Sequence, residues 1–240
     1  MADPVKESWD KNAEAWTAGV ESDAPRLLFN EPRFLDFMGR LTGRRVLDAA
    51  CGEGHLTRQV SAGHVAGIDL SPKLIDIARA AGGADYHVGD ITAMTMFADA
   101  SFDAVVSFMA LMDVADLSGA LKEFRRVLTP DGDLFIAIRH PCFLAPRFDV
   151  VPWRGGERRL AIGGYFLKGP YTGRALATGI MPIPRFQRTL SDYVAALANA
   201  GFGIAAIEEP RPSDEACAKL PMLEFWRREA AMFLYIRATR

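Results

Sequence analysis

The sequence lacks several features that mark well-known classes of protein. Its 240 residues include only three cysteines, Cys51, Cys142 and Cys217, whose spacing fits neither a disulfide framework nor a zinc or redox motif. No apolar run is long enough to span a membrane, and residues 1–7 are polar and charged, without the apolar centre of a signal peptide. We therefore expect a cytoplasmic protein in a reducing compartment, with no metal site.

The sequence also lacks a strong charge of either sign. Lys and Arg number 28 against 30 Asp and Glu, so the net charge is only −2 at pH 7. Such a chain has no long-range attraction for nucleic acid or for an anionic lipid surface, and we expect neither as a partner. Half of the residues are hydrophobic, which is typical of a globular protein, and the length suits one large domain with a full core.

The segment around residues 45–60 carries the first functional signal. Residues 45–50 predict a short buried strand, Gly52 and Gly54 predict a tight loop, and residues 53–60 predict a helix. Glycines without a Cβ let the backbone approach a ligand closely, and the first turn of a helix presents free N–H groups that favour an anionic group. A plain turn with no ligand is the alternative interpretation.

Acidic residues lie at or near the ends of three successive predicted strands. Asp48 ends the first, Asp69 the second, at residues 65–70, and Asp90 the third, at residues 86–91. Since ligands of open parallel sheets bind outside the carboxyl ends of the strands, we expect all three acids to line one cleft. Asp69 could then accept both hydroxyls of a ribose. Helix caps and solvated loop charges are the alternatives for such acids.

Helical and strand patterns alternate along the rest of the chain. We expect helices at residues 3–19, 25–38 with a possible break at Pro32, 72–80, 117–128 and 189–200, strands at 102–108, 133–139, 202–207 and 231–236, and a surface excursion at 210–228 that ends in a short helix. This alternation predicts an α/β fold with a doubly wound parallel sheet. Residues 140–188 interrupt it, and we expect an ordered cap there with a strand-like run at 160–167.

Taken in order, five segments resemble the class I S-adenosylmethionine-dependent methyltransferases that act on small molecules. They are residues 47–54, 67–71, 89–91, 101–107 and 124–132. The resemblance covers residues 9–139 well and residues 189–240 more loosely. It implies a Rossmann-like sheet of seven mostly parallel strands with an antiparallel last hairpin. It also implies a single domain, 1–240, with an N-terminal helical lid at 1–43, a core at 44–139 and 189–240, and an inserted substrate cap at 140–188.

The resemblance implies S-adenosyl-L-methionine as cofactor and S-adenosyl-L-homocysteine as its product. The residues it assigns to cofactor binding are Asp48, Ala49, Ala50, Gly52, Gly54, Asp69, Leu70, Asp90, Ile91, Phe108 and Trp16. Asp69 would accept hydrogen bonds from the ribose hydroxyls, and Asp90 would accept one from the adenine amino group. Leu70 and Ile91 would contact the adenine ring. Ala50 stands where many relatives carry glycine, so we expect it to keep ordinary backbone angles. Trp9 and Trp16 either close over the methionine end or only dock their helix.

The resemblance further implies in-line transfer of a methyl group to a small-molecule acceptor, at oxygen or nitrogen. Methyltransferases that act on nucleic-acid bases or protein glutamine commonly carry Asn/Asp-Pro-Pro-Tyr after the fourth strand. Residues 107–110 here are Ser-Phe-Met-Ala. The candidates for contact with the acceptor are Met109, Tyr165, Tyr171 and Arg174. Residues 187–189, Gln-Arg-Thr, stand where a related subgroup has His-Arg-Thr, so a base is not expected there.

His140 is the candidate general base, because it closes the fifth predicted strand and precedes Pro141. A structural histidine that caps the strand is the alternative. Two other functions share the core pattern. A nicotinamide-dependent oxidoreductase would usually add a small residue at Thr57 and a catalytic Tyr/Lys or Cys/His set, and the sequence has neither. A non-catalytic cofactor-binding protein would keep the cleft but lose the acceptor pocket.

Overall fold

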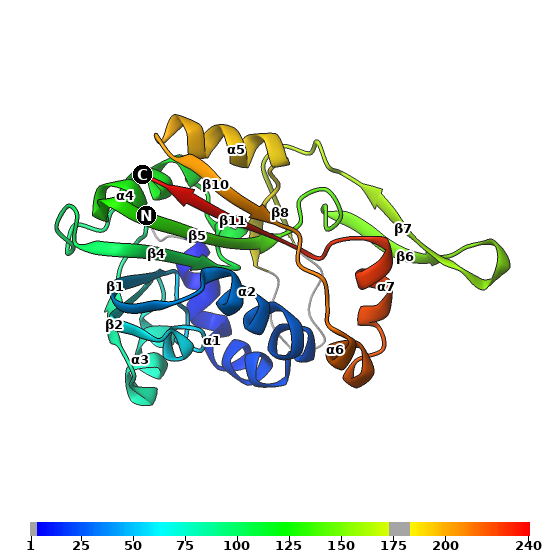
Figure 1. The fold of residues 1–240 in the computed structure, drawn as a ribbon, viewed down its shortest axis with the longest axis horizontal. Helices are drawn as coiled ribbons and strands as arrows, with labels where there is room; N and C mark the ends of the chain where they lie inside the picture. The colour runs from blue at the N-terminus through cyan, green and yellow to red at the C-terminus, as the bar shows by residue number, and fades with distance from the viewer. Residues whose placement is uncertain (1–3, 173–182) are drawn as a thin grey trace.

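The computed structural model describes residues 4–172 and 183–240, which form a seven-stranded sheet with helices packed on both faces (Figure 1). The strand order is β3-β2-β1-β4-β5-β11-β10. The strands are β1 Leu41–Ala49, β2 Ala62–Asp69, β3 Asp85–Val88, β4 Phe102–Phe108, β5 Leu128–Arg139, β10 Gly203–Glu208 and β11 Phe233–Thr239. Among the described strands of this sheet, β11 alone runs opposite to the other six. The predicted Rossmann-like, mostly parallel sheet with an antiparallel end is confirmed.

Alternating side chains of the central strands build a core on each face of the sheet. Leu47 of β1 joins a cluster with α4 and α5, whereas Val46 joins a cluster with α2, α6 and α7 on the other face. Both side chains are fully buried. Strands covered on both faces are typically rich in Val, Ile, Leu and Ala, and the central strands have this composition. The core therefore fixes the sheet and leaves the carboxyl ends of its strands to carry the site.

The helices agree with the predicted order of elements. They are α1 Pro4–Ser22, α2 Glu31–Met38, α3 Pro72–Ala81, α4 Leu117–Val127, α5 Leu190–Asn199, α6 Asp214–Lys219 and α7 Leu223–Glu229. A π-helical segment, η1 Arg26–Asn30, leads directly into α2. The break expected at Pro32 is absent, because this proline lies in the first turn of α2, where its missing N–H has no role. The excursion before β11 contains two short helices, not one.

The helix predicted at residues 53–60 was wrong. Turns follow β1, and only a short 3-10 helix, η2 Thr57–Gln59, forms. Gly52 and Gly54 both take positive φ angles, +59° and +78°, which interrupt a right-handed helix. A helix dipole therefore cannot supply an anion site here. Any ligand must be bound by the side chains and the backbone groups of the loop.

Residues 140–188 contain two small antiparallel sheets. One pairs β6 Arg147–Pro152 with β7 Arg158–Gly163, and Figure 1 shows this ribbon projecting from the body. The other pairs β8 Pro170–Thr172 with β9 Pro184–Phe186. The strand-like run expected at 160–167 overlaps the end of β7. None of the described helices combines the length and apolarity needed to cross a membrane.

Candidate active site

A cleft lies at the carboxyl ends of β2 and β4 and along the loops after β1 and β3. Asp69 and Leu70 line it from β2, residues 89–92 from the loop after β3, and residues 108–110 from β4. Trp9 and Trp16 of α1 also line it. The sequence-predicted residues that the structure gathers here are Trp16, Ala50, Gly52, Asp69, Leu70, Asp90, Ile91, Phe108 and Met109.

The loop after β1 is tied to β2 by its backbone. The N–H groups of Ala50 and Cys51 both donate to the carbonyl of Ile68, at 2.8 and 3.0 Å. Gly52 N–H donates to Asp69 Oδ2 at 2.9 Å. The expectation of ordinary backbone angles at Ala50 was wrong, because its φ is +64°. Alanine therefore takes a left-handed conformation that is ordinarily taken by glycine, at a cost of about 1–2 kcal/mol.

Asp69 is a buried carboxylate held in place by two backbone donors. Ser71 N–H bonds its Oδ1 at 2.9 Å, while Gly52 N–H bonds Oδ2. Its side chain is nevertheless part of the cleft wall, and burial raises the pKa of Asp69 to about 6. Each carboxylate oxygen can accept more than one hydrogen bond. Asp69 is therefore oriented by the protein and can still accept bonds from hydroxyl groups in the cleft.

Asp90 has a similar arrangement at the far end of the cleft. Thr92 N–H donates to its Oδ1 at 2.8 Å, and no residue in the described part of the chain bonds Oδ2. Leu70 and Ile91 line the cleft beside it with apolar side chains. One free acceptor next to apolar walls suits a planar ring with an amino group.

Asp48 does not line the cleft, so the expectation that three acids share it was wrong for this residue. Asp48 is 1% exposed and accepts a hydrogen bond from Thr57 Oγ1 at 2.6 Å. Burial raises the pKa of Asp48 to about 7. Ala49 and Gly54 are also outside the cleft wall. A Cβ at Gly54 would lie 2.5 Å from the hydroxyl of Tyr86, so this glycine makes room for a neighbouring side chain.

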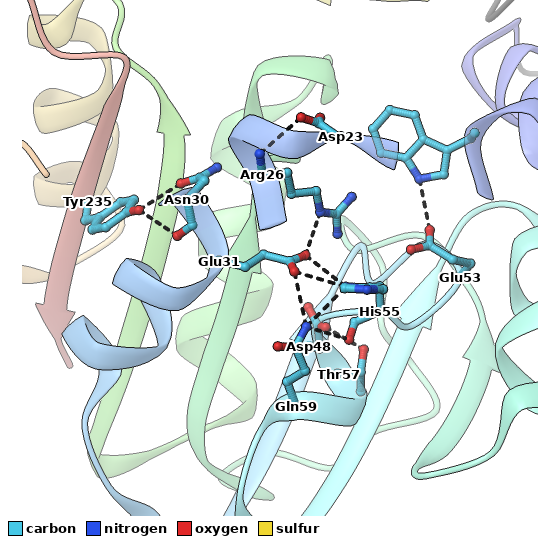
Figure 2. Close-up of polar contacts among 11 residues, drawn as sticks. Asp23, Arg26, Asn30, Glu31, Asp48, Glu53, His55, Thr57, Gln59 and Tyr235 are labelled. Carbon is cyan, nitrogen blue, oxygen red and sulfur yellow. Dashed lines mark hydrogen bonds and ion pairs between the residues drawn. The ribbon is translucent and has the colours of Figure 1, made fainter. Parts of the chain in front are cut away.

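Sequence reasoning missed Glu53, although it lies inside the motif. Its carboxylate, labelled in Figure 2, is buried, and Oε2 accepts a hydrogen bond from Trp16 Nε1 at 2.9 Å. Oε1 is also buried and has no hydrogen-bond partner among the described residues. Glu53 lines the cleft. An unbonded buried carboxylate oxygen is costly, which indicates that a ligand donor or cation completes it.

Arg26 is a second residue that the sequence did not reveal. Its guanidinium lines the cleft, lies over the ring of Phe108 at 5.5 Å and donates from Nε to Glu31 Oε1 at 2.5 Å. Glu31 is itself buried and also contacts His55 Nδ1 and Gln59 Nε2 (Figure 2). This cluster fixes the direction of Arg26. No local pattern in the sequence predicts it, because it depends on the π-helical turn of η1.

Helix α1 covers the cleft through its two tryptophans. Their rings meet edge to face at 5.1 Å, and Trp16 is anchored to Glu53. Asp10 accepts a hydrogen bond from Ser71 Oγ at 2.5 Å, which ties α1 to the start of α3. The tryptophans thus dock the helix and line the cleft at the same time.

The mouth of the cleft after β4 holds a third unpredicted residue, Asp113. It lies in a short 3-10 helix, η3 Leu111–Asp113, and its side chain lines the cleft while being 8% exposed. Arg185 Nε forms an ion pair with Oδ1 at 3.3 Å, but the alignment leaves this oxygen without a hydrogen bond from any described residue. Burial raises the pKa of Asp113 to about 6. Asp113 is therefore a candidate proton acceptor.

His140 is buried beside β11 and does not line the cleft. Cys142 N–H donates to its Nδ1 at 3.2 Å, which places the ring proton on Nε2, and Nε2 donates to Glu209 Oε1 at 2.7 Å. Burial lowers the pKa of His140. Both ring nitrogens are thus committed to the protein, as expected of a structural histidine.

The remaining candidates for contact with the acceptor also lie apart from the cleft wall. Tyr165 accepts a hydrogen bond from Leu190 N–H at 3.0 Å and so helps to cap α5. Tyr171 pairs with Arg185 across the β8–β9 ladder. Arg174 lies outside the described residues.

Known proteins match this chain in sequence and in structure. Residues 47–136 match a family described as a methyltransferase domain. The chain is 41% identical over 101 residues to a malonyl-[acyl-carrier protein] O-methyltransferase of Erwinia billingiae, a match that covers 41% of this chain and 40% of that protein. It is 31% identical over 140 residues to a ubiquinone biosynthesis O-methyltransferase of Xanthomonas oryzae pv. oryzae, covering 53% of this chain and 59% of that one. These matches thus span between 40% and 59% of the length of the two curated relatives.

The structural match is more extensive. A solved S-adenosylmethionine-dependent methyltransferase from Mesorhizobium loti has a TM-score of 0.78 with this chain at 29% identity, covering 92% of this chain and 100% of its own. The ordered motifs, the strand order and these matches agree with one another. The fold is that of the class I S-adenosylmethionine-dependent methyltransferases, and residues 47–136 match the methyltransferase domain family.

Proposed function

We propose that the protein transfers a methyl group from S-adenosylmethionine to an oxygen or nitrogen atom of a small-molecule acceptor. The charge pattern of the cleft carries this proposal. Acidic side chains at Glu53, Asp69, Asp90 and Asp113 line it together with the guanidinium of Arg26. A nucleoside that bears a sulfonium, an ammonium and a carboxylate presents the complementary charges and hydroxyls.

The residues of the cleft fit each part of this cofactor. Asp69 would accept the ribose hydroxyls, and Asp90 would accept the adenine amino group between Leu70 and Ile91. Glu53, with its unbonded Oε1, would hold the ammonium group. Arg26 would pair with the carboxylate, which guanidinium groups bind well. A pyrophosphate-bearing dinucleotide would instead face several carboxylates, which disfavours the oxidoreductase alternative.

When bound, the cofactor supplies an electrophilic methyl group that an acceptor atom attacks in line. The protein contributes mainly alignment, which can lower the barrier by about 7–11 kcal/mol. Trp9 and Trp16 exclude water from the cleft, and Phe108 and Met109 shape its mouth. Asp113 Oδ1 would take the acceptor's proton. A positioned base typically adds a factor of about 10² to 10⁴.

The names of the curated relatives favour oxygen over nitrogen as the methylated atom. The proteins from Erwinia billingiae and Xanthomonas oryzae pv. oryzae are both O-methyltransferases. A carboxylate such as Asp113 can receive the proton of a hydroxyl group as that group attacks. We therefore propose that the acceptor is methylated at a hydroxyl group rather than at an amine.

Titration calorimetry tests the cofactor assignment. We expect S-adenosylmethionine and S-adenosylhomocysteine to bind, and NAD and NADP not to bind. Asp69→Ala should weaken S-adenosylhomocysteine at least tenfold, because two hydroxyl partners are lost. Asp76→Ala removes an exposed carboxylate from α3 and serves as the matched control. Equal affinities in the two variants would refute the ribose assignment.

Turnover separates an enzyme from a non-catalytic binder. A donor labelled in its methyl group, incubated with a panel of small hydroxyl, carboxyl and amine compounds, should give labelled product with at least one of them. Tight cofactor binding with no transfer to any panel member would favour the binding protein.

A further inference from the structure

Two arginines, Arg139 and Arg185, lie close to Asp113 and to each other, behind the residues that line the cleft. Arg139 is the last residue of β5, and Arg185 lies on β9 next to Tyr171 of β8. Arg185 reaches Asp113 at 3.3 Å, and this aspartate forms part of the cleft wall. The cluster of Asp113, Arg139, Tyr171 and Arg185 is therefore continuous with the proposed methyl-transfer site.

Arg139 is short of partners. Its guanidinium lies over the ring of Phe148 at 5.5 Å, and no hydrogen bond or ion pair joins it to any residue in the described ranges. Burial and the nearby charge of Arg185 lower the pKa of Arg139 to about 10, against opposing effects of Tyr171 and Asp113. A half-buried cation without a bonded anion is unfavourable in the free protein, which indicates that a ligand completes it.

A third arginine nearby, Arg188, has its donors engaged by backbone carbonyls. Arg188 donates to the backbone carbonyls of Leu111 and Ala115, at 2.8 and 2.9 Å, and so holds the turn that carries Asp113. Its role is explained by these bonds. The charges of Arg139, Arg185 and Arg188 all act on the single carboxylate of Asp113, so the cluster has an excess of positive charge.

We propose that Arg139 and Arg185 bind a carboxylate of the methyl acceptor, so that the acceptor is an organic acid. The excess positive charge favours an anionic group, and Asp113 would repel a phosphate dianion more strongly than a carboxylate. The planar fork of a guanidinium also matches a carboxylate in shape. This inference rests on the proposed function, because the cluster gains its meaning from the adjoining methyl-transfer cleft.

Matched pairs of acids and amides test the proposal by calorimetry in the presence of saturating S-adenosylhomocysteine. The probes are acetate, benzoate and 4-hydroxybenzoate against acetamide, benzamide and 4-hydroxybenzamide. We expect at least one acid to bind, and to bind at least tenfold more tightly than its amide. Arg139→Met and Arg185→Met should each weaken that acid at least tenfold. Arg154→Met, at an exposed hairpin position, should leave it unchanged.

Arg139→Lys separates the contribution of bidentate hydrogen bonding from that of positive charge. Lysine keeps the charge but cannot form the paired bonds of a guanidinium. It should bind the acid more tightly than Arg139→Met and less tightly than the unchanged protein. Circular dichroism and S-adenosylhomocysteine affinity, both expected to be unaltered, show that each variant is folded. Absence of binding by every acid, or equal binding of acids and amides, would overturn the carboxylate site. Failure of S-adenosylhomocysteine itself to bind would instead refute the proposed function.

Discussion

Ala50 shows how one residue can hold strain at a cleft. Its φ of +64° is a glycine conformation, and the loop bonds to Ile68 keep it there. We predict that Ala50→Gly raises the free energy of unfolding by about 0.5–1 kcal/mol, since relief of the strain exceeds the entropy that glycine adds to the unfolded chain. Urea denaturation measures this. Ala49→Gly, one residue earlier in a buried strand, should lower stability, and a loss in both variants would argue against strain at Ala50.

The pH dependence of kcat can show whether Asp113 or His140 is the general base. Its pKa is raised by burial to about 6, so its carboxylate form, which can take a proton, prevails only above that pH. We predict that kcat, measured with a labelled donor, rises as pH increases through about 6 and then levels. Asp113→Asn should remove this rise and lower kcat by a factor of about 10² to 10⁴. The same rise in Asp113→Asn and its loss in His140→Ala would return the role to His140.

Helix α1 is the element that closes the cleft, and Trp16 is its anchor. Trp16→Phe keeps the aromatic contact with Trp9 but removes the indole donor, so the carboxylate of Glu53 loses its one hydrogen-bond donor among the described residues. We predict that S-adenosylhomocysteine binds about three- to tenfold more weakly, by calorimetry, and that the amides of α1 exchange hydrogen faster. Trp153→Phe makes the same change at an exposed site. Identical behaviour of the two variants would mean that α1 closes without this bond.

Elements with local stop and start signals were predictable from the sequence. Ser71 and Pro72 begin α3 as expected, and Thr189 caps α5 before Gly201 ends it with a φ of +84°. The helix predicted at residues 53–60 failed because two glycines with positive φ outweigh an apolar periodicity. Thr57 is moreover bonded to Asp48, a tertiary contact that no local pattern contains.

The site was predictable where a residue's position in a strand decides its direction. Asp69 and Asp90 face the cleft because they lie at or just beyond the carboxyl ends of adjacent parallel strands. His140 also follows the carboxyl end of a strand, but its ring nitrogens are hydrogen-bonded to Glu209 and to the backbone of Cys142, and it does not face the cleft. Arg26 and Asp113 could not be predicted as site residues. The placement of Arg26 depends on a π-helical turn, and that of Asp113 depends on contacts with residues 185–188.

Across the whole molecule, several buried acids hold protons more tightly than they would in an unfolded chain. Burial raises the pKa of Asp48 to about 7 and those of Asp69 and Asp113 to about 6, from an ordinary value of 3.8. His140 opposes them, since burial lowers its pKa below 6.5. Acids with lowered pKa, such as Asp103, affect stability mainly below about pH 5, where the unfolded chain begins to bind protons at these positions.

These shifts set the sign of the pH dependence of stability. Between pH 4 and 7 the folded protein binds more protons at the three acids than the unfolded chain does, so its free energy of unfolding falls as pH rises. Each unit of pKa shift corresponds to about 1.4 kcal/mol, and three acids outweigh one histidine. We predict that urea denaturation of the cofactor-free protein gives a free energy several kcal/mol higher at pH 5 than at pH 7.5. Asp48→Asn should reduce this difference, and equal or greater stability at pH 7.5 would show that these carboxyl groups are ionised at little cost in the folded state.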